Sequence, residues 1–172
     1  MKILHLNTND LVGGAARNAL TLSESLFALG VDSSILVQDR KGENPSVLKI
    51  KGGIRSKIWQ RVVPYWERFV LERYSRYSGQ PWSLNCLPRS VYREINAFKP
   101  DIVHLHWICG GFIPLFVLHQ ILGKIVWTLH DSWLFTGGCH IPHDCVGYQS
   151  HCGYCPQLGS KVLWDISYAA LR

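Results

Sequence analysis

The sequence lacks any long hydrophobic run. Its longest apolar stretches, such as residues 112–118, are far shorter than the roughly 20 residues that a membrane-spanning helix needs. The first residues, MKILHLN, contain neither the long apolar segment nor the small-residue cleavage site of a signal peptide. We therefore expect a cytoplasmic protein without a transmembrane helix.

Several motifs of common enzyme classes are also missing. The sequence has no GxGxxG, and no Gly-Lys-Ser/Thr follows its first glycine pair as a P-loop requires. It has no Gly-x-Ser-x-Gly nucleophile elbow. Asp39 could be the acidic residue of a dinucleotide site, but the glycine spacing disfavours that class. Nothing supports a nucleophilic serine or cysteine.

Negative charge is scarce and unevenly distributed. Asp and Glu total 12 against 18 Lys and Arg, and residues 51–76 hold seven of the cations with two anions. Apolar residues recur three or four apart over residues 54–77, which predicts a long helix that Pro64 should kink or split. A basic, aromatic helix suits peripheral contact with a membrane surface. A helix packed on a sheet is the alternative, and we expect no nucleic-acid partner.

The remaining composition predicts a soluble α/β protein. With 172 residues, 47% hydrophobic and 17% charged, we expect a single domain over residues 1–172 that buries a sizeable core. Apolar runs and helical periodicity alternate, which predicts a Rossmann-like, doubly wound and mostly parallel sheet. The expected strands are 2–6, 32–38, 46–51, 101–107 and a buried run from 124, and the expected helices are 15–30, 54–77, 90–98, 110–123 and 160–172.

A glycine pair lies where the first strand passes into the first helix. Residues without a Cβ allow the backbone to approach a phosphate, and a helix N-terminus offers free N–H groups and a partial positive charge. Gly13 and Gly14, with Arg17 one turn later, are therefore candidate substrate-binding residues. A tight turn that needs a positive φ is an equally good explanation for the glycines.

Histidines mark the ends of two later strands. Ligands of open α/β sheets gather beyond the carboxyl ends of the strands. His130 with Asp131, which follow the strand from residue 124, are therefore candidate catalytic residues. His104 and His106 alternate along the strand 101–107, and His106 is the better candidate because it lies nearer the carboxyl end. Histidines satisfied within the core are the alternative for both.

A loop over residues 137–156 is rich in cysteine, glycine and histidine. It has too few aliphatic residues to hold itself together by burial, and Cys139, Cys145, Cys152 and Cys155 fall within it at a C-x5-C-x6-C-x2-C spacing. Four thiolates can bind zinc in a tetrahedron, and C-x2-C places two of them on one turn. A structural zinc site is the first interpretation. Free or disulfide-paired cysteines, or a redox or iron–sulfur role, are the others.

Three segments together resemble a known family. MKILHLNTND..GGAARNAL, DIVHLHW and WTLHDSWLFTGGCH....C......C..CPQL are similar to the N-terminal domain of bacterial retaining glycosyltransferases with the GT-B fold, group 1 or family 4. The resemblance implies that Gly13 and Gly14 lie at the donor phosphate and that His130 approaches the transferred sugar. It also implies that the domain holds a saccharide or lipid-linked acceptor, that a basic, aromatic patch contacts the membrane, and that no divalent ion takes part in the chemistry.

The sequence departs from that family in one large respect. Family members have a second domain that binds most of the nucleotide-sugar donor and supplies a Glu-x7-Glu motif, and neither occurs before Arg172. We therefore expect the chain alone to be inactive as a transferase. A metal-stapled, non-catalytic binding or scaffolding module is the alternative function.

Overall fold

The three-dimensional structure is a computed structural model that describes residues 1–51, 54–87 and 90–170, without the side chains of residues 54–57 and 60. The chain forms two compact units. The first, called here the sheet unit, comprises Met1–Gln60 and Leu87–His130. The second, called the cysteine unit, comprises Arg61–Cys86 and Asp131–Arg172.

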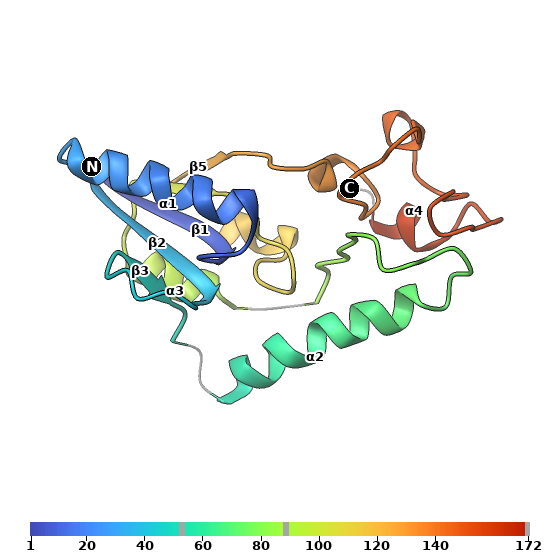
Figure 1. Ribbon diagram of the computed structural model, residues 1–172, viewed down its shortest axis with the longest axis horizontal. Helices are drawn as coiled ribbons and strands as arrows, with labels where there is room; N and C mark the ends of the chain where they lie inside the picture. Colours follow the sequence, from blue (N-terminus) through green and yellow to red (C-terminus); the bar gives the residue numbers. More distant parts are fainter. Residues whose placement is uncertain (52–53, 88–89, 171–172) are drawn as a thin grey trace. The chain divides into compact units, whose positions relative to one another are not determined.

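The sheet unit is built on five parallel strands (Figure 1). Their order is β3-β2-β1-β4-β5, and every pairing between neighbours is parallel. This confirms the predicted α/β, Rossmann-like fold, with a sheet that is wholly and not mostly parallel. The strands are β1 (Lys2–Asn9), β2 (Asp32–Asp39), β3 (Val47–Lys49), β4 (Ile102–Leu105) and β5 (Lys124–Trp127).

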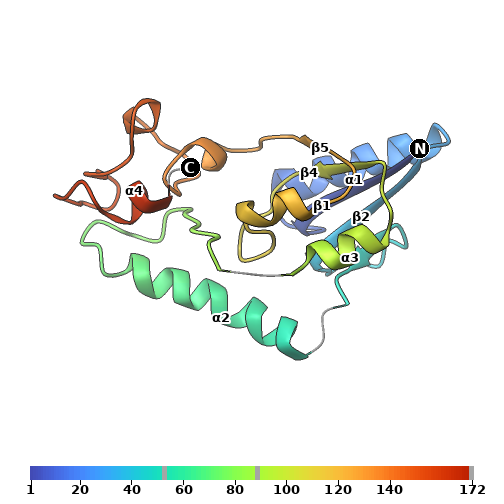
Figure 2. The same cartoon turned by 180° about the vertical axis from the view of Figure 1, so that it is seen from behind.

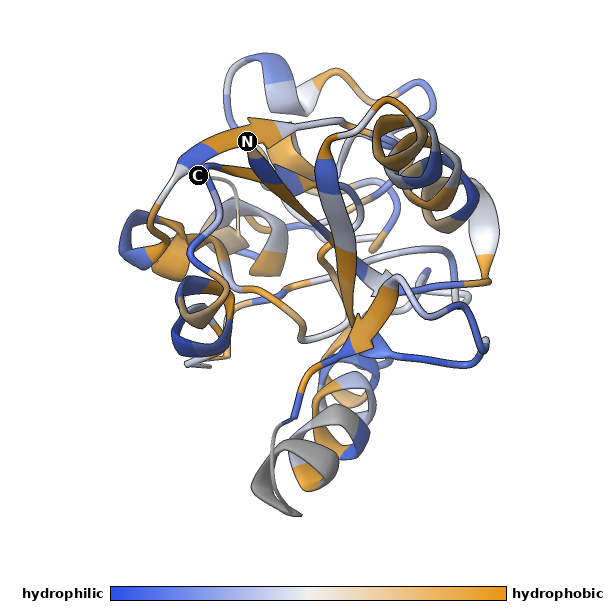
Figure 3. Ribbon diagram, turned by 90° about the vertical axis from the view of Figure 1, so that its left-hand side faces the viewer, coloured by the Kyte–Doolittle hydropathy of each residue, from blue (hydrophilic) through white to orange (hydrophobic). Residues whose placement is uncertain are grey.

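Helices cover both faces of this sheet. Helix α1 (Gly13–Ala28) lies on one face, while α3 (Tyr92–Ala97) and the 3-10 helix η1 (Leu115–Gln120) lie on the other (Figures 1 and 2). Strands buried from both sides need apolar residues on both faces, and β1 and β2 each contain a run of buried apolar residues. Figure 3 shows hydrophobic and polar stretches alternating along the ribbons. The side chains of β1 and β2 form the centre of the core, with Leu4, Leu6 and Val37 fully buried.

Strand β5 differs from the buried strand that its sequence predicts. Ile125 and Val126 keep 40% and 46% of their surface exposed. The strand is the last in the order and pairs with β4 alone among the described residues. The expectation of a buried strand is therefore wrong, because an apolar run does not reveal whether a strand lies at the centre or at the edge of a sheet.

The predicted helix over residues 110–123 is also mostly absent. Helical structure there is confined to η1. Gly110 and Gly111 have φ values of +68° and +72°, and Pro114 is extended with ψ of 143°. These conformations lie outside the right-handed helical region, so the segment forms a glycine turn and then one short 3-10 helix.

Helix α2 (Ile54–Leu71) begins within the residue range of the sheet unit and ends in that of the cysteine unit. It continues through Pro64 as one helix, so the predicted split does not occur, and it ends at Leu71 and not at residue 77. Among the described residues no helix is both long and apolar enough to span a membrane.

The rest of the cysteine unit has little regular structure. It contains the 3-10 helices η2 (Trp133–Phe135) and η3 (Gly147–Gln149) and the short helix α4 (Ile166–Ala170). The helix predicted for 160–172 is thus limited to α4, and residues 171–172 lie outside the described part of the chain. Its buried hydrophobic cluster comprises Leu71, Trp82, Leu84, Cys139, Cys155 and Leu158.

Candidate functional site

The carboxyl ends of β1 and β4 form the point where the strand order reverses. The chain passes from β1 through α1 to β2 on one side, whereas β4 lies on the other side of β1. Doubly wound sheets bind ligands at such a switch point, outside the carboxyl ends of the strands. The structure therefore locates the candidate site at the start of α1 and at the segment that follows β4.

The N-terminus of α1 is open to solvent. Gly13 and Gly14 are exposed, and a Cβ added to either residue would meet no atom within 4 Å. Gly13 has φ of +86°, which explains why glycine is needed there, whereas Gly14 has no such constraint. The N-cap residue Val12 makes no side-chain cap hydrogen bond to the described residues. The first N–H groups of the helix are thus available to an anion, with exposed Arg17 one turn later.

The turn that leads into α1 is fixed by polar contacts. The Val12 amide donates to Asn9 Oδ1 at 2.6 Å. The buried carboxylate of Asp10 accepts hydrogen bonds from the backbone N–H groups of Lys41 and Gly42, both at 2.8 Å. These contacts tie the end of β1 to the segment after β2, so the helix N-terminus has a defined position on the sheet.

Three histidines form a hydrogen-bonded chain across the sheet unit. His5 Nδ1 lies 3.1 Å from His106 Nε2, and His106 Nδ1 lies 3.1 Å from His130 Nε2. His5 and His106 are buried, whereas His130 is exposed. The structure therefore brings the two predicted site histidines together and adds a third, His5, at the buried end of the chain.

Burial keeps the inner histidines neutral. Desolvation lowers the pKa of His106 to about 3, with smaller contributions from His104, His5 and His130. Desolvation and then His104 lower the pKa of His5 to about 4. Desolvation also lowers the pKa of His104, whose Nε2 lies 2.8 Å from the Thr128 hydroxyl. At neutral pH each buried ring of the chain therefore has a single N–H.

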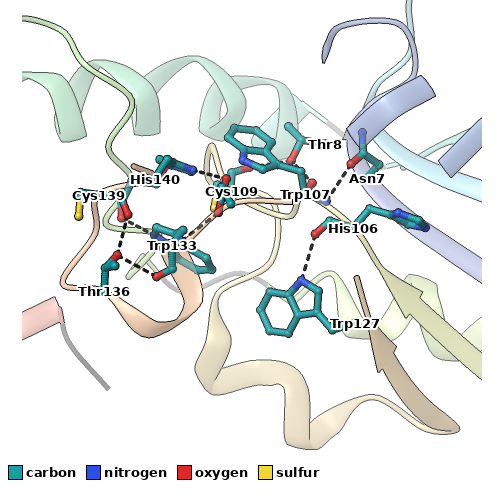
Figure 4. A network of polar contacts seen from close by, with 12 residues as sticks. Asn7, Thr8, His106, Trp107, Cys109, Trp127, Trp133, Thr136, Cys139 and His140 are labelled. Atoms are coloured by element: carbon teal, nitrogen blue, oxygen red, sulfur yellow. Dashed lines mark hydrogen bonds and ion pairs between the residues drawn. The ribbon is translucent and has the colours of Figure 1, made fainter. Parts of the chain in front are cut away.

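The segment after β4 is held by side chains of β1 and β5 (Figure 4). Asn7 Oδ1 accepts a hydrogen bond from the Trp107 amide, and the Thr8 hydroxyl donates to the carbonyls of Trp107 and Cys109 at 3.0 and 2.8 Å. The Trp127 indole donates to the His106 carbonyl at 3.0 Å. These bonds restrain the backbone on both sides of His106, which limits the positions its ring can take.

Asp131 takes part in a polar network within the cysteine unit, and its partners Trp133 and His140 are labelled in Figure 4. Its Oδ2 lies 2.5 Å from His140 Nδ1, and its Oδ1 accepts the Trp133 amide at 2.9 Å. His140 is buried, and its Nε2 lies 2.9 Å from the Ser83 hydroxyl. The Trp133 indole donates to the Ser83 carbonyl at 2.7 Å. The carboxylate thus orients His140, and a catalytic role for Asp131 stays a prediction.

The four predicted cysteine ligands lie around one cavity of the cysteine unit. Cys139, Cys145, Cys152 and Cys155 all line this cavity, whose volume is about 20 Å³. None of them forms a disulfide. Burial raises the pKa of the Cys155 thiol to about 11, and it also raises those of Cys139 and Cys152. The sequence spacing and the structure therefore select the same four residues.

A second group has metal-ligand chemistry. Among the described residues, His5, His104 and His106 form a group whose ligand atoms all lie within 4.8 Å of one another. Their mutual hydrogen bonds and the bond to Thr128 account for most of these nitrogen positions without an ion. The buried His5 Nε2 has no hydrogen-bond partner among the described residues. We interpret His5 and His106 as part of the imidazole chain that ends at His130, with His104 bonded to Thr128 beside it.

A larger cavity, of about 430 Å³, lies elsewhere in the sheet unit, between the β2–β3 edge and α3. Its lining includes Leu36, Leu48 and Phe98 with the basic residues Arg40, Lys49 and Lys51, and it does not include the predicted substrate-binding residues. It therefore adds no support to the site at the switch point.

Several residues of the site escaped the sequence analysis. His5 lies within an apolar strand, and its pairing with His104 comes from the register of β1 against β4. Asn7, Thr8 and Asp10 follow it on the same strand and its extension. The sequence signal for these residues is that a strand with an apolar beginning has an unusually polar end, HLNTND.

The parallel sheet, with a helix N-terminus and histidines at its switch point, defines a Rossmann-like domain. Residues 12–172 match the family model of Glycosyltransferase Family 4, and the chain belongs to that family. It is 25% identical over 174 residues to the putative colanic acid biosynthesis glycosyl transferase WcaC of Escherichia coli K12. That alignment covers 93% of this chain but 40% of the relative. No solved structure matches the chain significantly.

Proposed function

We propose that the chain is the acceptor-side domain of a retaining glycosyltransferase. In the proposed reaction a sugar moves from a nucleotide-sugar donor to a hydroxyl of a polysaccharide or glycolipid acceptor. Membership of Glycosyltransferase Family 4 supports the reaction class, and the relative in Escherichia coli is named for the biosynthesis of a polysaccharide. The observation that supports the location is the open N-terminus of α1 at the switch point of the sheet.

The N-terminus of α1 is proposed to hold the diphosphate of the donor. When the sugar leaves, negative charge grows on the diphosphate oxygens. The N–H groups near Gly13 and Gly14 are fixed in position and can hydrogen-bond the charged oxygens without rearranging. They therefore stabilise the transition state more than the ground state. Arg17 adds a full positive charge one turn later in the helix. In this proposal the charge is met by the protein's own groups, and the transfer needs no cofactor.

His130 is proposed to contact the transferred sugar. His106 and His5 are positioning residues, because they act on the sugar only through His130. His106 hydrogen-bonds His130 directly, and His5 hydrogen-bonds His106. If each neutral ring donates from Nδ1, the partnerless His5 Nε2 is a lone pair and not a buried N–H, which costs less. His130 then accepts at Nε2 and has its proton on Nδ1. The chain therefore favours one tautomer and one orientation of the exposed imidazole.

Gly14→Ala tests the diphosphate site without disturbing the fold. The added methyl meets no protein atom within 4 Å, and alanine is favoured over glycine in a helix by up to about 1 kcal/mol. We expect the stability to be unchanged or raised. Binding of a nucleoside diphosphate should weaken at least about tenfold, because the methyl group keeps the phosphate from the backbone. Calorimetry on the full-length protein measures both. Asn18→Ala, at an exposed position of the next turn, is the matched control.

His130→Ala should lower kcat of sugar transfer by about 100-fold in the same protein, since one positioned group in a transition state is worth that much. Transfer is measured with labelled nucleotide sugars and lipid-linked acceptors. Full activity of both variants would refute the site. Acceptor binding by a protein with no affinity for any nucleotide sugar would instead favour the non-catalytic binding module.

We also propose that α2 makes a peripheral contact with a membrane surface. Its exposed large side chains are Ile58, Val62, Tyr65, Trp66 and Phe69. Arg61, Arg68 and Arg73 are exposed on or just after the same helix, while Arg55 and Lys57 of the basic segment lie outside the described side chains. Exposed aromatic residues beside cations match an anionic lipid surface, where the acceptors of such enzymes are anchored.

A further inference from the structure

The cysteine unit has little regular structure after Asp131 and a small hydrophobic core. From Asp131 onward its helices η2, η3 and α4 have three, three and five residues. Two of the six buried residues in its hydrophobic cluster are themselves cysteines of the loop, Cys139 and Cys155. Domains with so small a core are usually stabilised by disulfides or by a bound metal ion.

The four loop cysteines converge although they lie far apart along the loop. All four line the cavity of about 20 Å³, which is large enough for one water-sized particle or one metal ion. The same thiols are near enough to affect one another's charge: Cys145 and Cys152 contribute to the raised pKa of Cys139, and Cys139 contributes to that of Cys155. The cysteines outside the loop, Cys86 and Cys109, do not line the cavity.

Hydrogen-bond donors of the protein are directed at these sulfur atoms. The backbone N–H groups of Gln157 and Leu158, two and three residues after Cys155, donate to its sulfur. The Gly137 backbone N–H donates to Cys152. Burial has the larger effect and raises the pKa of these thiols, and the donors offset part of that rise. Donors to sulfur are typical of the groups that surround cysteine ligands of metals.

Glycines allow the loop segments to approach closely enough. A Cβ at Gly137 would lie 2.1 Å from the Ser167 carbonyl oxygen and 2.9 Å from the Cys152 Cβ. A Cβ at Gly153, inside the C-x2-C turn, would lie 2.4 Å from the Leu163 carbonyl oxygen. The turn that presents Cys152 and Cys155 therefore packs backbone against backbone, which is how short metal-binding turns are built.

We propose that Cys139, Cys145, Cys152 and Cys155 bind one Zn²⁺ ion in a structural, tetrathiolate site. Soft thiolate ligands in a closed set of four favour zinc over calcium or magnesium, and no ligand position is left for a substrate. In a tetrahedron with Zn–S bonds of about 2.3 Å the sulfur atoms lie roughly 3.8 Å apart. The four thiols are not among the described groups within 4.8 Å of one another, so binding draws them inward around the cavity.

Metal content and thiol reactivity test this site independently of sugar transfer. We expect one zinc per chain in the product of the whole reading frame purified without chelators. The four loop thiols should react with a thiol reagent only after zinc is removed. Adding Co²⁺ to the metal-free protein should give the intense visible bands of tetrahedral cobalt–thiolate coordination.

Cys152→Ser should lower the zinc content by at least about tenfold, and Cys86→Ser, a cysteine outside the cavity, should leave it at one. If Cys152→Ser does not fold, the thiol titration of the unmodified protein decides the matter. Substoichiometric zinc with four freely reactive loop thiols would overturn the proposal, as would a loop disulfide or bound iron.

Discussion

At the scale of single residues, the least expected feature is the buried His5. It occupies the centre of an apolar strand, yet its ring begins the chain of imidazoles that ends at the exposed His130. Because burial disfavours the charged imidazole, full stability of the sheet unit requires His5 to be neutral. This requirement links the candidate site to the stability of the fold.

The buried histidines make stability depend on pH. His5 and His106 have pKa values of about 4 and 3 in the folded protein, below the 6.5 of a free histidine. Between these values the unfolded chain binds more protons, so the free energy of unfolding falls as pH drops from about 6.5 towards 4. The expected slope is about 1 kcal/mol per pH unit for each histidine, measured by urea unfolding at several pH values.

His5→Gln should remove its share of that slope. His119→Gln, at an exposed position of η1, is the matched control and should keep the slope of the unmodified protein. Glu67 acts in the opposite direction, because burial raises its pKa and its contribution favours the folded state at low pH. Identical slopes for the His5 variant and the unmodified protein would contradict this account.

At the scale of elements, two helices have exposed features with opposite chemistry. The N-terminus of α1 offers bare N–H groups beside glycines, which suits an anion. Helix α2 offers apolar rings beside arginines, and the Arg73 guanidinium lies 4.4 Å from the centre of the Phe69 ring. The first suits a small anionic ligand, whereas the second suits an extended surface.

Phe69→Ser should weaken binding to vesicles that contain anionic lipid. The Phe69 side chain is 56% exposed, and moving such a ring from water into the lipid interface is worth about 1 kcal/mol, or roughly fivefold in affinity. Co-sedimentation with phosphatidylglycerol vesicles measures the effect. Binding should weaken with salt and be lower on purely zwitterionic vesicles.

Phe27→Ser is the control for this helix. Phe27 is 66% exposed, but it lies near the C-terminal end of α1, away from any concentration of cations. Its substitution should not change vesicle binding. An equal loss of binding in both variants would point to general hydrophobic adhesion and against a membrane-facing α2.

At the scale of the whole molecule, the two units depend on different forces. The sheet unit is stabilised by continuous apolar burial, with Leu4, Leu6 and Leu105 fully buried. In the cysteine unit the proposed metal site supplies what the small core lacks. Removing the ion should therefore loosen one unit and leave the other intact.

Hydrogen exchange can measure this difference by segment. After chelation, amides of residues 136–158 should exchange faster, whereas those of β1 and β2 should keep their protection, because local unfolding follows local stability. Re-adding zinc should restore slow exchange. Uniform loosening of both units, or no change in either, would argue against separate sources of stability.

The sequence predicted the positions of most helices and strands better than it predicted their burial and their neighbours in the fold. Local patterns were sufficient for β1, β2, α1 and α3, because apolar periodicity and glycine stop signals act over short distances. The apolar run from residue 124 predicted the strand β5 correctly but not its exposure, which depends on strand order. The pattern failed for residues 110–123, where Gly110, Gly111 and Pro114 override apolar content. The order β3-β2-β1-β4-β5 was implied only by the general preference for doubly wound sheets.

By itself the sequence determined that the chain is an α/β protein, with glycines opening the first helix, histidines ending strands and four cysteines in one loop. Only the tertiary structure decided which groups meet. It linked His5 to His106 and His130, paired Asp131 with His140, and gathered the four cysteines around a single cavity. The physical reason is that composition and local periodicity fix the conformation of short segments, whereas contacts between distant residues depend on strand register and loop closure.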